Sequence, residues 1–218
     1  MSSLLKISKG IYEEKRFVVG CVYMEIKNNQ LYLGGIVAEE LVAKHGSPVY
    51  VYEENIIRQR YRKLKESISY PKFAVHYACK SNTNLKIMKI LHEEGCRIDA
   101  VSPGEVFLAL KAGYKPKEIL YTGVNVTEKE MKLLLEQGVL LNIGSLDELE
   151  RYGELNPNSK VSIRINPDVG GGHHGHVITG GPDSKFGIYY DKVQEAKKIA
   201  ARYELKIIGV HSHIGSGI

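Results

Sequence analysis

The chain has 218 residues, of which 43% are hydrophobic and 25% are charged, and this balance is ordinary for a folded protein and excludes a disordered or fibrous one. Thirty Lys and Arg residues against 25 Asp and Glu residues give a formal charge of +5, which is spread along the chain and gives no support for a nucleic-acid partner. No apolar stretch approaches the roughly 18 residues of a membrane span, so we expect no membrane partner. The three cysteines form no C-x-x-C pair, and the charged N-terminus is unlike a signal peptide. Both features predict a cytoplasmic protein.

Residues 17–36 contain two apolar segments around the turn-forming Lys27-Asn28-Asn29, a pattern that predicts a β-hairpin. From Ser47 onward, short apolar segments alternate with helical stretches, which is typical of βα units that build a parallel sheet. The predicted strands lie near 48–53, 73–80, 96–101, 118–122, 139–143, 161–166 and 207–213. The predicted helices lie near 55–68, 84–94, 104–112, 127–137, 145–152 and 191–203.

Several of the predicted helices begin with recognisable capping residues. Three helix starts carry the S/T-x-x-E pattern of a capping box, in which the cap and the third helical residue each bind the other's backbone N–H. They are Ser102…Glu105, Thr127…Glu130 and Ser145…Glu148. Residues 167–187 form a long insertion before the last helix, and loops of that length are usually functional.

Side-chain alternation along the strands decides between a (β/α)8 barrel and a doubly wound sheet. Strand 73–80 places Cys79 on one face and Lys80 on the other, and strand 161–166 separates its apolar residues from Arg164 and Asn166. A doubly wound sheet is covered by helices on both faces and should be apolar on both. A barrel carries polar groups at its C-terminal mouth, where the active site lies. We therefore expect an α/β fold of the barrel type, with the doubly wound sheet as the alternative.

Seven polar residues stand at inward positions near the predicted strand ends. They are Lys80, Asp99, Asn142, Arg164, Asn166, His211 and His213. A buried ammonium needs a partner or a depressed pKa, so Lys80 either forms a structural salt bridge with Asp99 or serves as an amine nucleophile. Cys79 faces the helices by parity, and we expect it to be a buried small hydrophobe and not a nucleophile.

The segment 211–217 after the seventh strand, H-S-H-I-G-S-G, permits two interpretations. Barrels often bind phosphate in this place, and Gly215, Ser216 and Gly217 offer backbone N–H groups and a hydroxyl for it. Alternatively, His211 and His213 share a strand face and could ligate a metal, as in a zinc-dependent barrel hydrolase. Further ligands would then come from His173, His174 and His176. Against the metal stands the positive charge of Lys80 beside it.

Six motifs in the second part of the chain occur together in one order. They are Y-A-C-K-S-N (77–82), D-A-V-S-P-G-E (99–105), N-I-G-S-L-D-E-L (142–149), R-I-N-P-D-V (164–169), T-G-G-P-D-S-K-F-G-I (179–188) and H-S-H-I-G-S-G-I (211–218). In these motifs the sequence resembles the alanine-racemase-type barrel decarboxylases that use pyridoxal 5'-phosphate (PLP), and within them the diaminopimelate decarboxylases.

The resemblance implies a role for each candidate residue. Lys80 would hold PLP as a Schiff base, His213 would stack on the pyridine ring, and both are the candidate catalytic residues. Ser216 with Gly215 and Gly217 would bind the phosphate, Arg164 would contact the phenolic oxygen, and Asp99 would lie beside the lysine. Residues 179–187 would help to enclose the substrate. The candidate substrate-side residues are Asn142, Asn166, Ser184 and His211.

The implied reaction is the decarboxylation of meso-2,6-diaminopimelate to L-lysine and CO2 in lysine biosynthesis, by an enzyme of fold type III that is a homodimer at full length. Ser212 and Gly217 stand where the family usually has Cys and Gln, so another basic amino acid or a carboxylated polyamine is the alternative substrate. A non-catalytic PLP-carrier barrel is a further alternative, but the lysine of such carriers comes much nearer the N-terminus than Lys80.

The last predicted strand ends close to Ile218, so we expect about seven of the eight barrel strands in an incomplete PLP-binding (β/α)8 TIM barrel. We expect residues 1–40 to be strands of a C-terminal β-domain that is absent, and residues 41–218 to be the partial barrel. The chain is then expected to be a fragment that is inactive alone, because the partner of the pyridine nitrogen would lie beyond it.

Overall fold

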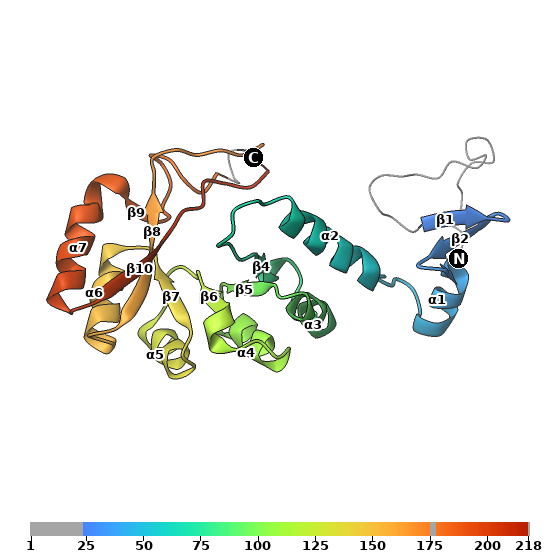
Figure 1. Cartoon of the computed structure of the whole chain (residues 1–218), viewed down its shortest axis with the longest axis horizontal. Helices are drawn as coiled ribbons and strands as arrows, with labels where there is room; N and C mark the ends of the chain where they lie inside the picture. The colour runs from blue at the N-terminus through green and yellow to red at the C-terminus, as the bar shows by residue number, and fades with distance from the viewer. Residues whose placement is uncertain (1–23, 175–177, 218) are drawn as a thin grey trace. The chain divides into compact units, whose positions relative to one another are not determined.

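A computed structural model of the chain describes residues 24–174 and 178–217 (Figure 1). Its internal contacts divide the chain after Ser67 into two units. The first unit contains a small antiparallel sheet and two helices, and the second contains the parallel sheet and the polar residues singled out above. The domain boundary expected between residues 40 and 41 stays a prediction.

The first unit begins with the predicted hairpin. Strands β1 (Met24–Lys27) and β2 (Gln30–Leu33) pair antiparallel, with Lys27 opposite Gln30. Asn28 and Asn29 have φ values of 49° and 60°, the left-handed conformation that a two-residue hairpin turn requires and that Asn tolerates. The hairpin is confirmed for residues 24–33, whereas residues 17–23 lie outside the described residues. Three further elements are β3 (Ile36–Val37), α1 (Ala38–His45) and α2 (Glu54–Glu66).

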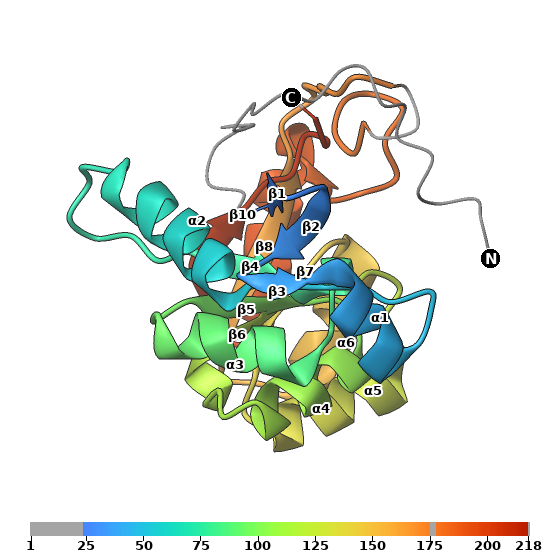
Figure 2. The ribbon, with the colours of Figure 1, turned by 90° about the vertical axis from the view of Figure 1, so that its right-hand side faces the viewer.

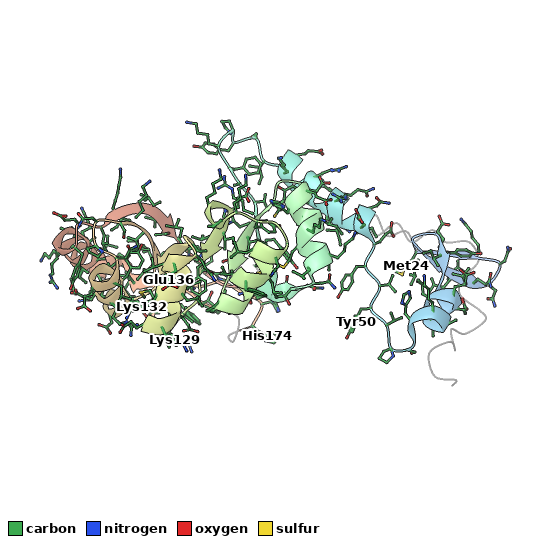
Figure 3. All side chains as sticks on the ribbon, turned by 90° about the horizontal axis from the view of Figure 1, so that it is seen from below. Met24, Tyr50, Lys129, Lys132, Glu136 and His174 are labelled. Atoms are coloured by element: carbon green, nitrogen blue, oxygen red, sulfur yellow. The ribbon has the colours of Figure 1, made fainter. Side chains whose placement is uncertain are left out.

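The strand predicted at 48–53 is wrong. Residues 48–53 have no regular secondary structure, and Tyr50, labelled in Figure 3, is 87% exposed. Alternating Val and Tyr residues favour a strand locally, but a strand forms only where a neighbour pairs with its backbone. No such neighbour is present among the described residues of this unit.

The second unit is built on six parallel strands that neighbour one another in chain order. These strands are β4 (His76–Ala78), β5 (Arg97–Ala100), β6 (Ile119–Tyr121), β7 (Leu140–Ile143), β8 (Lys160–Asn166) and β10 (Lys206–His211). A two-residue strand, β9 (Ile188–Tyr189), also pairs with β8. The helices are α3 (Leu85–Glu93), α4 (Pro103–Lys111), α5 (Glu128–Glu136), α6 (Leu146–Leu155) and α7 (Val193–Arg202). The short 3-10 turns in the described residues are η1 (Cys79–Ser81), η2 (Pro116–Glu118) and η4 (Tyr190–Lys192).

The helices identify the sheet as part of a barrel. Figure 2 shows α3, α4, α5 and α6 on one side of the parallel sheet. A doubly wound sheet would have helices on both faces, whereas strands in chain order with helices outside them are the arrangement of a (β/α)8 barrel. The fold is therefore an α/β fold that matches a partial barrel. Six parallel strands follow one another across the sheet, where we expected seven. In the described residues β4 and β10 are the two ends of this path, and the sheet does not close.

The predicted alternation of side chains is confirmed in the middle of the sheet. Ile98, Leu141 and Ile163 are buried in the core on the side that carries the helices. On the opposite face Asn142 lies beside Ser162, and Arg164 lies beside His211. The polar residues of adjacent strands thus gather on the face that would become the barrel interior.

Two of the three predicted capping boxes differ from the expected pattern. Thr127 and Glu130 form the full box, in which each residue accepts the other's backbone N–H. Ser102 and Ser145 cap their helices as predicted, but Glu105 and Glu148 accept N–H groups from Val101 and Gly144, one residue before the cap. Short loops between strand and helix leave these N–H groups without a strand partner, so the glutamates bind them instead.

Candidate active site

A cavity of about 330 Å³ opens at the C-terminal ends of the parallel strands. Its lining comes from the segments that follow β4, β5 and β6, from β8, from the long loop after β8 and from the segment after β10. The lining residues are Lys80, Val101, Thr122, Gly123, Val124, Arg164, Thr179, Phe186 and His213. Three of the predicted site residues, Lys80, Arg164 and His213, are therefore brought together.

Lys80 reaches this cavity from a turn and not from a strand. Strand β4 ends at Ala78, and η1 (Cys79–Ser81) carries the lysine. The turn is fixed by Ser81 Oγ, which donates to Ala78 O at 2.9 Å, and by Asn82 N, which donates to Cys79 O at 3.0 Å. Lys80 is exposed, and in the described part of the chain it forms no ion pair.

The predicted alternative of a structural Lys80–Asp99 salt bridge is thus not found. Asp99 is half-buried on β5 and Asp99 Oδ1 accepts a hydrogen bond from Thr122 Oγ1 at 2.5 Å. Ala78 and Asp99 are neighbours in the sheet, so the carboxylate lies next to the strand that leads to the lysine. The amine of Lys80 is left available for a ligand.

Cys79, the residue before Lys80, is fully buried, as predicted. Its thiol donates to Glu105 Oε2 at 3.3 Å and lies 3.4 Å from Asp99 O. Burial, followed by the charge of Glu105, raises the pKa of Cys79 to about 12. A thiol with this pKa stays protonated near neutral pH, which agrees with a packing role.

Arg164 is a buried cation on β8, with 8% of its surface exposed. Its Nη2 donates to Thr179 O at 3.1 Å and to His213 O at 3.3 Å, and the guanidinium lies 4.9 Å from the ring centre of Phe186. Burial lowers the pKa of this guanidinium. No carboxylate among the described residues pairs with Arg164, so its charge favours an anionic group in the cavity.

The two histidines at the end of β10 differ in position: His211 is the last residue of the strand, and His213 follows it. His213 lines the cavity, and its Nδ1 lies 2.6 Å from Thr179 Oγ1. His211 lies deeper, with Nδ1 3.4 Å from Asn142 Nδ2. Burial is the largest cause that lowers the pKa of each histidine, and the charge of Arg164 is the second. Both imidazoles are therefore expected to be neutral at pH 7.

The glycine-rich segment predicted to bind phosphate directly follows His213. Gly215 forms an isolated antiparallel bridge with Ile178, and Ile214 O accepts hydrogen bonds from Gly171 N and Thr179 N. Ser216 is exposed, and Gly217 has a φ of +70° and lies so close to the His173 ring that a Cβ there would overlap it. These residues are adjacent to the cavity in the chain but are not among its lining residues.

Three predicted substrate-side residues are engaged inside the protein. Asn166 Nδ2 donates to Gly181 O at 2.9 Å, and Gly181 N donates back to Asn166 Oδ1 at 3.0 Å. Ser184 Oγ accepts from Phe186 N at 3.2 Å, and Asn142 Oδ1 accepts from Ser162 Oγ at 2.9 Å. None of the three lines the cavity, and their assignment to the substrate stays a prediction.

Sequence reasoning did not single out Thr122, Thr179 and Phe186 as lining residues. Thr179 and Phe186 belong to the motif T-G-G-P-D-S-K-F-G-I, whose segment was expected near the mouth. Thr122 directly follows β6, and a hydroxyl at the end of an apolar strand was the available signal.

The metal interpretation gains no support from the arrangement. The described residues contain no group of three or more His, Cys, Asp or Glu side chains that could hold a metal ion. The rings of His173 and His174 meet edge to face at 5.6 Å, while His176 lies outside the described residues.

Comparison with known proteins decides the family. The sequence family described as "Pyridoxal-dependent decarboxylase, pyridoxal binding domain" matches residues 54–218. The chain belongs to this family. The zinc-hydrolase interpretation is therefore wrong, since the H-x-H pair that suggested it is part of a pyridoxal-binding domain. Within the described residues, no helix is both long and apolar enough to cross a membrane.

Individual relatives of this pyridoxal-dependent family are close in sequence and in structure. The diaminopimelate decarboxylase of Methanothermobacter thermautotrophicus is 48% identical over 86% of this chain and 45% of its own length. Structures of diaminopimelate decarboxylase with L-lysine, from Helicobacter pylori and from M. jannaschii, are 35% and 33% identical, each with a TM-score of 0.77. They match 82% and 89% of this chain, and 47% and 48% of their own chains. The chain thus spans about half the length of the relatives it matches.

The cavity has the groups that a pyridoxal cofactor requires. An aldehyde needs an amine, and Lys80 supplies one that no carboxylate of the described residues holds. An anionic ring oxygen needs a cation, and Arg164 is buried with no acidic partner among the residues that the structure describes. A flat ring needs a flat neighbour, and the imidazole of His213 also lines the cavity. The residues present therefore fit the group that the family is named for.

Proposed function

We propose that this chain binds PLP at Lys80 and forms the cofactor-binding part of a diaminopimelate decarboxylase. The observation that carries the proposal is one cavity lined by the amine of Lys80, the buried guanidinium of Arg164 and the imidazole of His213, where no carboxylate of the described residues pairs with either cation. An amine, a cation and a flat ring in one cavity match the chemistry of a pyridoxal aldehyde more closely than that of a metal or a nucleotide.

Each residue has a distinct part in the proposed reaction. When bound, PLP acts as an electron sink for the bonding electrons that a carboxylate leaves behind as CO2. Lys80 would hold the cofactor through its side-chain amine, which lines the cavity. Arg164 would hold the ring oxygen, and His213, whose Nδ1 lies 2.6 Å from Thr179 Oγ1, would pack against the ring. Asp99 stays fixed by Thr122, beside the strand that leads to Lys80. Gly215, Ser216 and Gly217 are proposed to bind the phosphate.

The proposed substrate is meso-2,6-diaminopimelate, which loses CO2 to give L-lysine. The names of the relatives support this choice, as do the two related structures described with L-lysine. Another basic amino acid or a carboxylated polyamine is the alternative, because Gly217 stands where the resemblance would place a Gln. A cytoplasmic location and a homodimer at full length stay predictions.

Titration of the chain with PLP tests the proposal. We expect a visible absorbance band that saturates with PLP, is abolished by Lys80→Ala and is kept by Lys86→Ala, a lysine on α3 outside the cavity. Addition of meso-diaminopimelate should change this band at lower concentration than L-arginine or L-ornithine does. A band that survives Lys80→Ala would contradict the site, and equal responses to the three amino acids would contradict the substrate.

A further inference from the structure

The three S/T-x-x-E motifs of the chain differ in what their glutamates bind. In the motif at the start of α5, Glu130 is half-buried and closes a capping box with Thr127. In the motif at the start of α6, Glu148 is only 3% exposed, and its carboxylate turns away from the cap. A buried carboxylate is costly unless its oxygens are bound, so its partners indicate what it is kept for.

Glu148 joins two different βα loops. Its Oε2 accepts the N–H of Gly144, directly before its own helix, at 2.9 Å. Its Oε1 accepts the N–H of Val126 at 3.0 Å, which belongs to the preceding loop between β6 and α5. One carboxylate therefore fixes the end of a loop that is 22 residues away in the chain.

The loop held by Glu148 is a wall of the cavity. Thr122, Gly123 and Val124 line the cavity, as do Arg164 and His213 from other elements. The loop contains Asn125 with a φ of +55°, a left-handed turn conformation that Asn tolerates. It also approaches the Tyr121 ring so closely that a Cβ on Gly123 would lie 2.6 Å from the ring hydroxyl. Such a loop needs ties at both ends to keep one conformation.

The other end of this loop is tied to the site itself. Thr122 N donates to Ala100 O at 2.8 Å, and Thr122 Oγ1 donates to Asp99 Oδ1 at 2.5 Å. The loop 122–126 thus runs from Asp99 at one end to Glu148 at the other. A shift at Val126 would be transmitted through three cavity-lining residues to the hydroxyl that orients Asp99.

We propose that Glu148 is a positioning residue of the cofactor cavity, which holds the 122–126 wall and through it the Thr122–Asp99 hydrogen bond. The effect on cofactor binding rests on the proposed function, whereas the effect of Glu148 on the conformation of the 122–126 loop does not. In Glu148→Gln the side chain keeps its shape, but its amide NH2 would face one of the two N–H groups that the carboxylate now accepts. Glu130→Gln is the matched control, because Glu130 has the same place in its helix and its carboxylate accepts hydrogen bonds from its own cap residue, Thr127.

Two measurements on the full chain test this proposal. Hydrogen exchange of the peptide that contains residues 122–126 should be at least about tenfold faster in Glu148→Gln than in the unmodified chain and in Glu130→Gln. The Kd for PLP should rise about tenfold, which corresponds to ~1.4 kcal/mol. Thr122→Val should raise the Kd to a similar degree, and the double variant should be weakened by less than the product of the two effects, since both changes act on one wall.

The outcomes separate the two claims. Unchanged exchange in Glu148→Gln, an unchanged Kd beside faster exchange, or fully multiplicative effects with Thr122→Val would each overturn the positioning role. If the unmodified chain bound no PLP, the proposed function would fail, and the exchange measurement alone would still decide whether Glu148 holds the loop. If Glu148→Gln did not fold, Glu148→Asp, which keeps the charge but is too short to reach both N–H groups, would take its place with the same expectations.

Discussion

Cys79 and Lys80 are consecutive residues with opposite environments. The thiol is fully buried against Glu105, whereas the amine is exposed at the cavity. Strand alternation was enough to predict this difference from the sequence. It could not show that β4 ends at Ala78. The 3-10 turn that carries Lys80 is held by hydrogen bonds from Ser81 and Asn82, and the alternation of apolar and polar residues does not reveal such bonds.

The raised pKa of Cys79, about 12, predicts that this thiol reacts slowly despite its place beside the site. At pH 8 a group with this pKa is a thiolate in only about one part in 10⁴. We expect alkylation of the Cys79 peptide by iodoacetamide, followed by mass spectrometry, to be negligible in the folded chain and rapid in urea. Equal rates in the two conditions would contradict the burial of the thiol.

His211 gives a prediction about pH. Its pKa lies below the ordinary value of 6.5 because of burial and then the charge of Arg164. The unfolded chain therefore takes up its proton first as the pH falls, so the stability linked to His211 is present above about pH 6.5 and is lost below it. We expect Tm to fall between pH 7.5 and pH 5.5, and to fall less in His211→Gln. The same fall in both proteins would show that His211 does not titrate as the structure requires.

At the scale of a single element, a few hydrogen bonds hold the long loop after β8 in one conformation. Asn166 binds Gly181 in both directions, and the hydroxyl of Tyr189 donates to Pro182 O at 2.6 Å and to Ser184 O at 2.9 Å. These bonds present Phe186 to Arg164 at the cavity. The sequence indicated that a loop of this length is functional, but not that Asn166 braces it, since an inward Asn on a strand also fits a substrate contact.

Asn166→Ala should loosen this loop without unfolding the sheet. It removes both side-chain bonds to the buried backbone of Gly181, and each unsatisfied buried group costs about 1–3 kcal/mol. We expect trypsin to cleave after Lys185 at least about tenfold faster than in the unmodified chain. Asp183→Asn, an exposed change in the same loop, is the control and should leave cleavage unchanged. Equal cleavage of Asn166→Ala and the control would argue that the loop is held by other contacts.

Helices and central strands were predictable because their signals are local. Cap residues and apolar periodicity placed α3 to α7 within a few residues of their bounds. The 48–53 segment failed because strand formation depends on a partner that its own residues do not encode. The predictions of capping boxes at Ser102 and Ser145 failed for a similar reason. Glu105 also accepts a hydrogen bond from Cys79, and Glu148 also accepts one from Val126, each in another βα unit.

At the scale of the molecule, the sheet of the second unit presents two ends in the described residues. On β10, Ile208 and Val210 are 48% and 72% exposed, although Val210 lies beside the buried Ile163. The register of β10 shifts between Ile207 and Gly209, so Ile208 has no partner on β8. The alternation of side chains predicted the polar face of this strand correctly. It could not predict the bulge, because the sequence alternates in the same way with or without the register shift.

The gathering of site residues is a property of the whole sheet. Lys80, Arg164 and His213 come from segments that span 134 positions of the chain, from Lys80 to His213 inclusive, and they meet because parallel strands end at one edge. The sequence could therefore predict the meeting from the fold class alone. It could not predict the internal contacts that occupy Asn142, Asn166 and Ser184, because these depend on the paths of individual loops.

Chemical trapping of the cofactor tests the central claim most directly. The full chain is incubated with PLP, reduced with borohydride, digested and mapped by mass spectrometry. The account predicts a pyridoxyl group on the peptide that contains Lys80, and its loss when Lys80→Ala is treated in the same way. A group attached to a different lysine, or no attached group at saturating PLP, would contradict the account.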